Sequence, residues 1–247
     1  MERGLILLVA ALMVYVATGV QGTSHLSFAN NTQVNITRDG CGVTKLCVET
    51  PDNCDPAGNN SCLFASVVTS TPVAPNGTEL SIELRGDSMG YIALGLTVNA
   101  SEGTTMLFIC AQNSSNNGTF FFRTMQRNNT DAGLTPTERR VTEIRGMVKG
   151  NVIQCEFNVP NVNATNTRTS HVTTFSLLLG TGSFDGSTLG PFNISRAIGP
   201  LNLANPASNI TTPAPTTMTT SGSSGAVHPH AVLLLLSVLT LSVSLRA

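Results

Sequence analysis

The stretch from Tyr91 to Cys110, YIALGLTVNASEGTTMLFIC, decides the fold. Two apolar runs of strand length flank a polar turn of Asn, Ser and Gly residues. Runs of this kind, bounded by turn-forming residues, predict two neighbouring β-strands. Met106 stands within the second run, where a methionine is either a filler of the core or a ligand.

The same pattern continues on both sides of this stretch, from Glu79 to Pro200. The expected strands are ELSIELRG, YIALGLTV, TTMLFICAQ, GTFFFRTM, RRVTEIRGMV, NVIQCEFNV and TTFSLLLGT. None of these runs has a sustained apolar period of 3.6 residues, so they predict an all-β domain of the β-sandwich type. The turns are expected at Gly86, Asn117-Gly118, Gly150-Asn151 and Gly180-Thr181-Gly182.

The N-terminus has the features of a secretory signal peptide. Arg3 supplies a positive charge, an apolar run extends from Leu5 to Val16, and small residues continue to Gly22. A membrane anchor is the alternative, but the run is short for a membrane span of about 20 residues. We therefore expect residues 1–22 to be a signal peptide that is removed near Gly22.

The C-terminus carries a second apolar run, from Ala231 to Leu245, after a Thr/Ser/Pro-rich stretch. Small residues around Ser221 and a short polar spacer precede it, which is the pattern of a glycosylphosphatidylinositol (GPI) signal. We expect lipid attachment at Ser221, removal of residues 225–247 and an O-glycosylated stalk over residues 205–224. A tail-anchored or single-span protein is the alternative. The lipid anchor would hold the protein at the extracellular face of the plasma membrane.

Between the two ends lies one domain, residues 23–204, which is large enough for a substantial core. The chain has a formal net charge of −1 at pH 7, and only 11% of its residues are Asp, Glu, Lys or Arg. Because no basic run occurs, nucleic acid is not an expected partner. Eleven Asn-x-Ser/Thr sequons predict a glycosylated surface: Asn30, Asn35, Asn59, Asn76, Asn99, Asn113, Asn117, Asn128, Asn163, Asn193 and Asn209.

Six cysteines in an extracellular chain predict disulfide bonds. Cys110 and Cys155 lie in strand-like runs, so a cross-strand or cross-sheet bridge between them is favoured. A zinc site is the alternative, but the short CxxC spacings and histidine partners of such sites are absent. Four cysteines are expected to staple one loop segment, residues 41–62, with the pairing among them left open: Cys41, Cys47, Cys54 and Cys62.

Few residues are suited to catalysis. After the expected processing, His25 and His171 are the remaining histidines, and no G-x-S-x-G elbow or Gly-rich phosphate loop occurs. The carboxylates are scattered along strand edges, which is typical of solvated faces. We therefore name no catalytic residue, and these patterns leave enzymatic activity open while favouring a protein without it.

Three consecutive segments resemble the ectodomain of ferric-chelate reductase-type proteins, the DOMON domain. They are RDGCGVTKLCVETPDNCDPAGNNSCLFASV, ELSIELRGDSMGYIALGLT and the Cys-ending strand that follows. The resemblance extends from about Thr37 to Leu201, and its most specific part is the spacing of the loop cysteines. It implies an immunoglobulin-like β-sandwich that binds haem or sugar. Full-length family members usually continue into a cytochrome b membrane domain, and without one we do not expect transmembrane electron transfer.

The resemblance also implies where haem ligands would stand. Haem-binding DOMON domains use a methionine in the turn after the YIALGL-like strand and a histidine after the FSLLLGTG-like strand. In this chain Glu102, followed by Gly103, takes the place of the methionine, and a carboxylate is a poor ligand for low-spin haem. Met106 is expected in the core, and His171 precedes the FSLLLGTG strand. A glycan at Asn99, in the same turn, would crowd a haem mouth.

The sequence therefore predicts an all-β, immunoglobulin-like sandwich of the DOMON type with a disulfide-stapled N-terminal loop segment. We expect it to lack haem and to act as a binding or interaction module for an extracellular protein or glycan ligand. The alternative is a haem b redox ectodomain related to ferric-chelate reductase, which transfers electrons to ferric iron. Met106 and His171 would then be the spare haem ligands.

Overall fold

The chain divides into two compact units, Met1–Thr211 and Thr212–Ala247, and all residues that can be described belong to the first. The predicted signal peptide, His25, His171 and Ser221 lie outside the described residues, as do the sequon positions Asn30, Asn76, Asn117 and Asn163. The computed structural model describes these parts of the chain: residues 26–27, 32–70, 78–113, 118–162 and 174–209.

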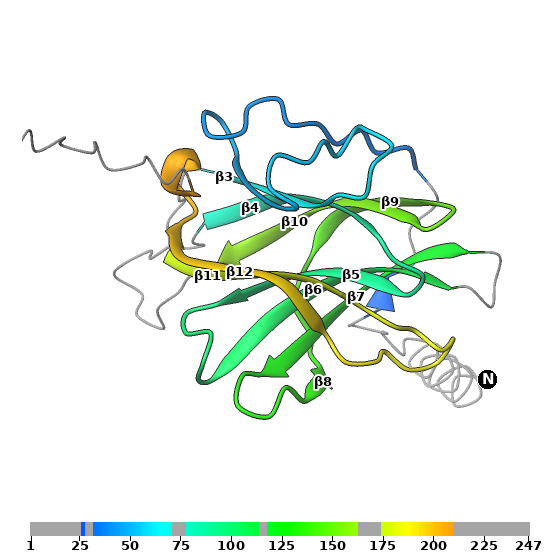
Figure 1. The fold of residues 1–247 in the computed structure, drawn as a ribbon. Coiled ribbons are helices and arrows are strands. Elements are labelled where there is room, and N and C mark those ends of the chain that lie inside the picture. The colour runs from blue at the N-terminus through cyan, green and yellow to red at the C-terminus, as the bar shows by residue number, and fades with distance from the viewer. Residues whose placement is uncertain (1–25, 28–31, 71–77, 114–117, 163–173, 210–247) are drawn as a thin grey trace, which may run out of the picture. The chain divides into compact units, whose positions relative to one another are not determined.

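The described residues form two antiparallel β-sheets (Figure 1). The seven-stranded sheet has the order β1-β7-β6-β5-β11-β12, with β8 beside β7, and its strands are β1 (Leu26–Ser27), β5 (Tyr91–Thr97), β6 (Thr104–Asn113), β7 (Thr119–Asn128), β8 (Leu134–Pro136), β11 (Thr174–Gly182) and β12 (Asn193–Asn202). The five-stranded sheet has the order β2-β3-β4-β10-β9, and its strands are β2 (Leu46–Thr50), β3 (Leu63–Thr69), β4 (Thr78–Asp87), β9 (Thr142–Lys149) and β10 (Val152–Val162).

A short 3-10 turn, η2 (Pro206–Asn209), follows β12. Within the described ranges, no helix has the length and apolar character needed to cross a membrane.

The two sheets pack face to face around one apolar core. In β10, buried and half-buried residues alternate from Ile153 to Val159, because successive side chains of a strand point to opposite faces. Inward side chains of both sheets form a single cluster. Its centre is aromatic: the Phe157 ring lies 5.5 Å from that of Phe108 and 4.8 Å from that of Phe122. The predicted β-sandwich is thus confirmed.

The stretch that decides the fold forms the central strands β5 and β6. Every residue of β5 is buried, because both faces of this strand are covered. Ile92 and Leu94 belong to the core between the sheets, whereas Tyr91 belongs to a second apolar cluster on the opposite face. Leu189 and Phe192, which follow β11, contribute to that second cluster. The seven-stranded sheet is therefore covered on both faces at its centre.

Disulfide bonds connect the sheets and close the loop segment. Cys110 of β6 is joined to Cys155 of β10, which is the pairing that the sequence favoured, and this bridge crosses from one sheet to the other. Both residues are completely buried. The loop segment contains two local bridges, Cys41–Cys47 and Cys54–Cys62.

Two of the turns expected from glycine are wrong. Gly86 lies inside β4 and Gly180 lies inside β11. A Cβ atom at Gly86 would lie 2.8 Å from Ile92 Cγ2, and one at Gly180 would meet the backbone carbonyl of Asn193. These glycines therefore permit close approach of neighbouring segments rather than chain reversal. Gly150 does lie in the turn between β9 and β10, with φ of 62°.

Some of the strands were not expected from the sequence: no strand was predicted before Glu79, and β12 has no strand-like pattern. β2 lies inside the loop segment and pairs with β3, which in turn pairs with β4. β12 is exposed along most of its length, because it forms an edge of the seven-stranded sheet. An edge strand of this kind lacks the alternation of apolar residues by which strands are recognised.

Candidate functional site

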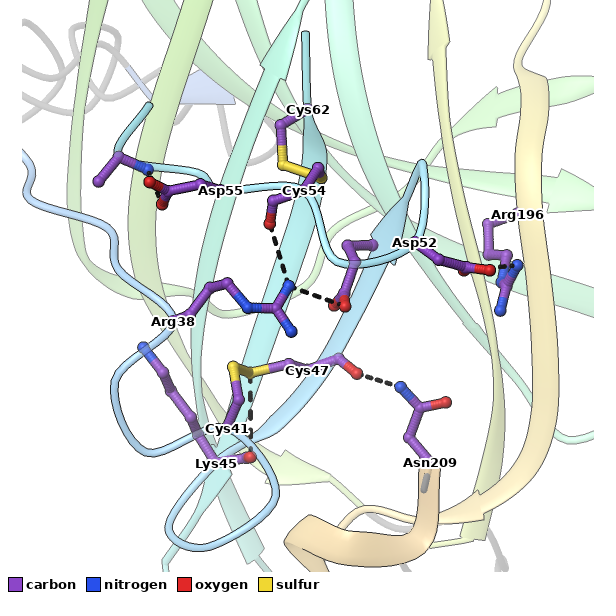
Figure 2. A network of polar contacts seen from close by, with 12 residues as sticks. Arg38, Cys41, Lys45, Cys47, Asp52, Cys54, Asp55, Cys62, Arg196 and Asn209 are labelled. Atoms are coloured by element: carbon purple, nitrogen blue, oxygen red, sulfur yellow. Dashed lines mark hydrogen bonds and ion pairs between the residues drawn. A yellow bond between two sulfur atoms is a disulfide. The ribbon is translucent and has the colours of Figure 1, made fainter. Parts of the chain in front are cut away.

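The loop segment is organised around a half-buried ion pair. Figure 2 shows the Arg38 guanidinium between two acceptors, where Nη1 donates to Glu49 Oε1 at 2.8 Å and to the backbone carbonyl of Cys54 at 3.0 Å. The Glu49 side chain is only 13% exposed. Arg38 therefore links the segment before the first disulfide to β2 and to the Cys54–Cys62 loop.

The second cation of this region, Lys45 of the loop segment, contacts the five-stranded sheet. Lys45 Nζ donates to the backbone carbonyl of Thr37 at 2.8 Å and to Glu83 Oε2 at 2.9 Å. Ser66 Oγ donates to the same carboxylate oxygen at 2.6 Å. Since Glu83 lies on β4, this contact fastens the loop segment to the middle of the sheet.

The third cation, Arg85 of β4, is 2% exposed. Its guanidinium donates to the Asp87 carboxylate and to the backbone carbonyls of Cys62 and Asn60. A buried cation is tolerated when it is paired and hydrogen-bonded in this way. Like Arg38 and Lys45, Arg85 is paired with a carboxylate of the same domain. We therefore assign these ion pairs to stabilising the fold rather than to binding a ligand.

Residues near the C-terminal end of the described domain contact the loop segment (Figure 2). Asn209 Nδ2 donates to the backbone carbonyl of Cys47, and Arg196 of β12 pairs with Asp52 at 3.2 Å. Both contacts tie residues from the C-terminal part of the domain to β2 and the residues after it.

The described carboxylates are not gathered into a reactive centre. No group of three or more His, Cys, Asp and Glu side chains in the described ranges could hold a metal ion. The exposed Asp185 accepts hydrogen bonds from the backbone N–H groups of Ser187 and Thr188, and these bonds hold its pKa below the usual value. This is the geometry of a turn rather than of an acid or base catalyst.

The structure separates the two described positions that the haem hypothesis singled out. Glu102 is exposed in the turn between β5 and β6, and its backbone carbonyl accepts a hydrogen bond from Asn129 Nδ2 at 3.0 Å. Met106 is half-buried on β6 and packs against the core, where it also lines a pocket. His171 lies outside the described residues.

This pocket, here called the end pocket, opens between the two sheets close to the turn from β5 to β6. Its volume is about 170 Å³. Both sheets supply its apolar walls, and the connection before β9 supplies one charged side chain, Arg139. The apolar lining consists of Leu96, Met106, Phe108, Val159, Val162 and Phe175.

Arg139 is held in place by backbone atoms. Its Nη2 donates to the carbonyls of Pro160 and Asn161 at 2.8 and 2.9 Å, just where β10 bulges out of register with β4. Burial lowers the pKa of this guanidinium. None of the ion pairs between described residues includes Arg139.

Haem, the cofactor that the family resemblance implies, does not fit the described residues of the end pocket. The volume of about 170 Å³ is below the roughly 300–1,000 Å³ of pockets that enclose drug-sized ligands. Met106 is the single lining residue with the chemistry of an axial iron ligand, and the guanidinium of Arg139 carries only hydrogen-bond donors. The lining favours a small organic ligand with apolar groups.

Sequence reasoning identified Met106 but missed Arg139. Arg139 and Arg140 stand side by side in the polar stretch TERRVT, and nothing in that stretch tells which of them turns inward. Arg140 is exposed, whereas its neighbour lines the end pocket. A local pattern could therefore not have selected Arg139.

The sequon asparagines within the described ranges are all accessible to solvent. Asn113 and Asn209 are half-buried, and the other five are exposed: Asn35, Asn59, Asn99, Asn128 and Asn193. Exposure is what a carrier of a glycan requires, and glycosylation stays a prediction.

No family model matches the chain, and no solved structure matches it significantly. Among curated proteins, the “Putative ferric-chelate reductase 1” of Danio rerio is 28% identical over 201 residues, which are 81% of this chain and 34% of that protein. A Xenopus laevis protein of the same name is 30% identical over 73 residues, or 30% of this chain. “Ferric-chelate reductase 1” of Homo sapiens is 30% identical over 70 residues, or 28% of this chain.

The chain spans 34% of the length of the Danio rerio relative and 11% of the other two. Disulfide bonds persist in oxidising compartments, so the three bridges and these relatives together indicate an extracellular or cell-surface protein. Over 81% of its length, the chain is thus similar to a protein named as a ferric-chelate reductase.

Proposed function

We propose that this protein is a GPI-anchored, N-glycosylated binding module of the cell surface, with a DOMON-type domain that lacks haem. Its ligand site is the end pocket. The proposal rests on one observation: a single cavity combines apolar walls from both sheets with a cation, Arg139, that forms no ion pair with a described residue. Ligand sites are mostly apolar cavities with a few polar groups that fix orientation.

The loop segment is the weaker candidate for the ligand site. Arg38, which precedes this segment, and Lys45 within it are paired with Glu49 and Glu83, so a ligand would have to displace contacts that hold the fold. The end pocket requires no such displacement, since Arg139 keeps donors that no described residue uses.

Blocking the end pocket tests the proposal. Val162 is 6% exposed and lines the cavity, so the larger side chain of Val162→Phe should fill it. The matched control is Val68→Phe, at a position that is 40% exposed on β3. Binding of 1-hexanol is measured by ligand-observed NMR on the mature glycoprotein. We expect 1-hexanol to bind the natural protein and Val68→Phe but not Val162→Phe. Equal binding to all three, or to none, would reject the end pocket as the site.

A haem b redox ectodomain, able to pass electrons to ferric chelates, is the second candidate function. It is favoured by the similarity, over 81% of this chain, to a protein named “Putative ferric-chelate reductase 1”. A visible spectrum of the purified mature protein separates the two proposals, because a Soret band with reducible α and β bands would overturn the haem-free module. Met106→Ala and His171→Ala would then test these two ligands, and a spectrum that survives both changes would eliminate them.

The lipid anchor has its own test. Phosphatidylinositol-specific phospholipase C should release the protein from intact cells, and Ser221 should carry the lipid. If the protein stays on the membrane while a known GPI-anchored protein is released, the anchor proposal is wrong and the single-span alternative stands.

A further inference from the structure

The half-buried Arg139 guanidinium has no carboxylate partner, unlike the cations around the loop segment, Arg38, Lys45 and Arg85. Of the 14 Asp and Glu residues, all but Glu2 lie in the described ranges, and Glu2 belongs to the predicted signal peptide. None of these described carboxylates pairs with Arg139. No carboxylate of the described domain therefore neutralises Arg139, and an anion that contacts it would be supplied by a ligand.

The hydrogen bonds of Arg139 leave part of its donor set unused. Both of its bonds, to Pro160 and Asn161, start from Nη2, and no acceptor among the described residues serves Nη1 or Nε. A guanidinium presents five N–H donors in a planar fork that matches a carboxylate. The two backbone carbonyls thus orient the side chain, and the Nη1 and Nε donors stay available to a ligand.

Partial burial makes this free charge suited to binding. Desolvation lowers the pKa of Arg139, yet an arginine keeps its proton in proteins. A charge that is partly removed from water interacts more strongly with an opposite charge than an exposed one does. An anion in contact with Arg139 would therefore recover interaction energy that solvent does not supply.

The apolar walls set the size of the rest of the ligand. The cavity of about 170 Å³ is close to an engineered apolar protein cavity of about 150 Å³ that takes up benzene. The end pocket can accordingly hold an apolar group of about six carbon atoms. Met106 suits such a group, because its unbranched and polarisable side chain adapts to irregular shapes.

We propose that the end pocket takes a small amphipathic carboxylate, with its apolar part between the sheets and its carboxylate on Arg139. This proposal rests on the proposed function, since it names the ligand class of the same site. The chemistry is that of a short-chain or aromatic acid, in which one charged head is joined to a compact apolar body.

A matched pair of probes tests the proposal: hexanoate and 1-hexanol, which share the chain length and differ in the charge of the head. Dissociation constants are measured by ligand-observed NMR on the mature glycoprotein. A charge-assisted hydrogen bond predicts that hexanoate binds at least about tenfold more tightly than hexanol. The [13C]methyl resonance of Met106, assigned through Met106→Leu, should shift with either ligand.

Two variants locate the charge effect. Arg139→Gln should bring hexanoate binding down to the level of hexanol while hexanol binding stays within about twofold, since only the charged contact is lost. Arg140→Gln removes the same charge from an exposed neighbour and should leave the preference for hexanoate intact. The unchanged affinity for hexanol also shows that Arg139→Gln is folded.

The outcomes separate this proposal from the one on which it rests. If both probes shift Met106 with equal affinity, or if Arg139→Gln keeps the preference for hexanoate, the carboxylate proposal is overturned and the end pocket remains the ligand site. If neither probe binds, or if Met106 does not respond, both proposals fall.

Discussion

Two regions of the molecule differ in how their partly or fully buried cations are paired. Around the loop segment, Arg38, Lys45 and Arg85 each contact a carboxylate. In the end pocket, Arg139 lines the same cavity as apolar side chains and donates to two backbone carbonyls. A charge that is paired within the domain helps to hold the fold, whereas a partly desolvated charge without a counter-ion is available to bind an anionic ligand. One region is therefore a structural layer, and the other is a candidate binding site.

The largest expected effect on the free energy of unfolding concerns the ion pairs around the loop segment. Arg85→Ala should lower the free energy of unfolding by about 3 kcal/mol, because it removes the cation from the ion pair with Asp87 and the donor to the carbonyl of Cys62. Urea unfolding of the mature protein measures this loss. The control is Arg196→Ala, in an ion pair whose side chains are 41% and 74% exposed, and it should cost less than about 0.5 kcal/mol. Equal losses would mean that burial does not set the value of these pairs.

Removing a disulfide of the loop segment should have the next largest effect. Cys54→Ala combined with Cys62→Ala opens a loop with a sequence separation of eight residues, and should lower the free energy of unfolding by about 2.5 kcal/mol. Hexanol binding to the end pocket should not change, because the two regions share no residue. A loss of hexanol affinity in a folded variant would show that the regions are coupled.

A smaller effect is expected for the wall of the end pocket. Met106→Ala should lower the free energy of unfolding by about 1 kcal/mol, less than the 2–5 kcal/mol of a fully buried methionine, because Met106 is half-buried beside an existing cavity. The enlarged pocket should also favour 1-octanol over 1-hexanol in the NMR assay. Met89→Ala is the control, at a methionine that is 73% exposed, and it should change neither quantity.

The smallest effect on stability is expected for Arg139. In Arg139→Gln the loss of two hydrogen bonds is opposed by the removal of a desolvated charge, so the free energy of unfolding should change by less than about 1 kcal/mol. The same urea measurement applies. A loss as large as that of Arg85→Ala would place Arg139 in the structural class and remove the contrast between the two regions.

Parts of this picture could be predicted from local patterns. The strands around Met106 follow from apolar runs between turn residues, and the choice of Cys155 as the partner of Cys110 follows from the position of both in such runs. Other parts could not be predicted. Gly86 and Gly180 look like turn residues but lie inside strands, because they admit Ile92 and the backbone at Asn193. A glycine that allows close packing has the same local sequence signal as one that allows a turn.

The sequence by itself determined the all-β class, the disulfide chemistry and the resemblance to ferric-chelate reductase-type proteins. These properties depend on residue type and short-range spacing, which a chain carries before it folds. Only the tertiary structure decided which charges are neutralised and where a cavity remains. The walls of the end pocket come from positions as distant as Leu96 and Phe175, and the partners of an arginine are the groups that folding brings within reach of its guanidinium. Arg139 and Arg140 are neighbours in the sequence, and packing alone places one of them in the pocket and the other in solvent.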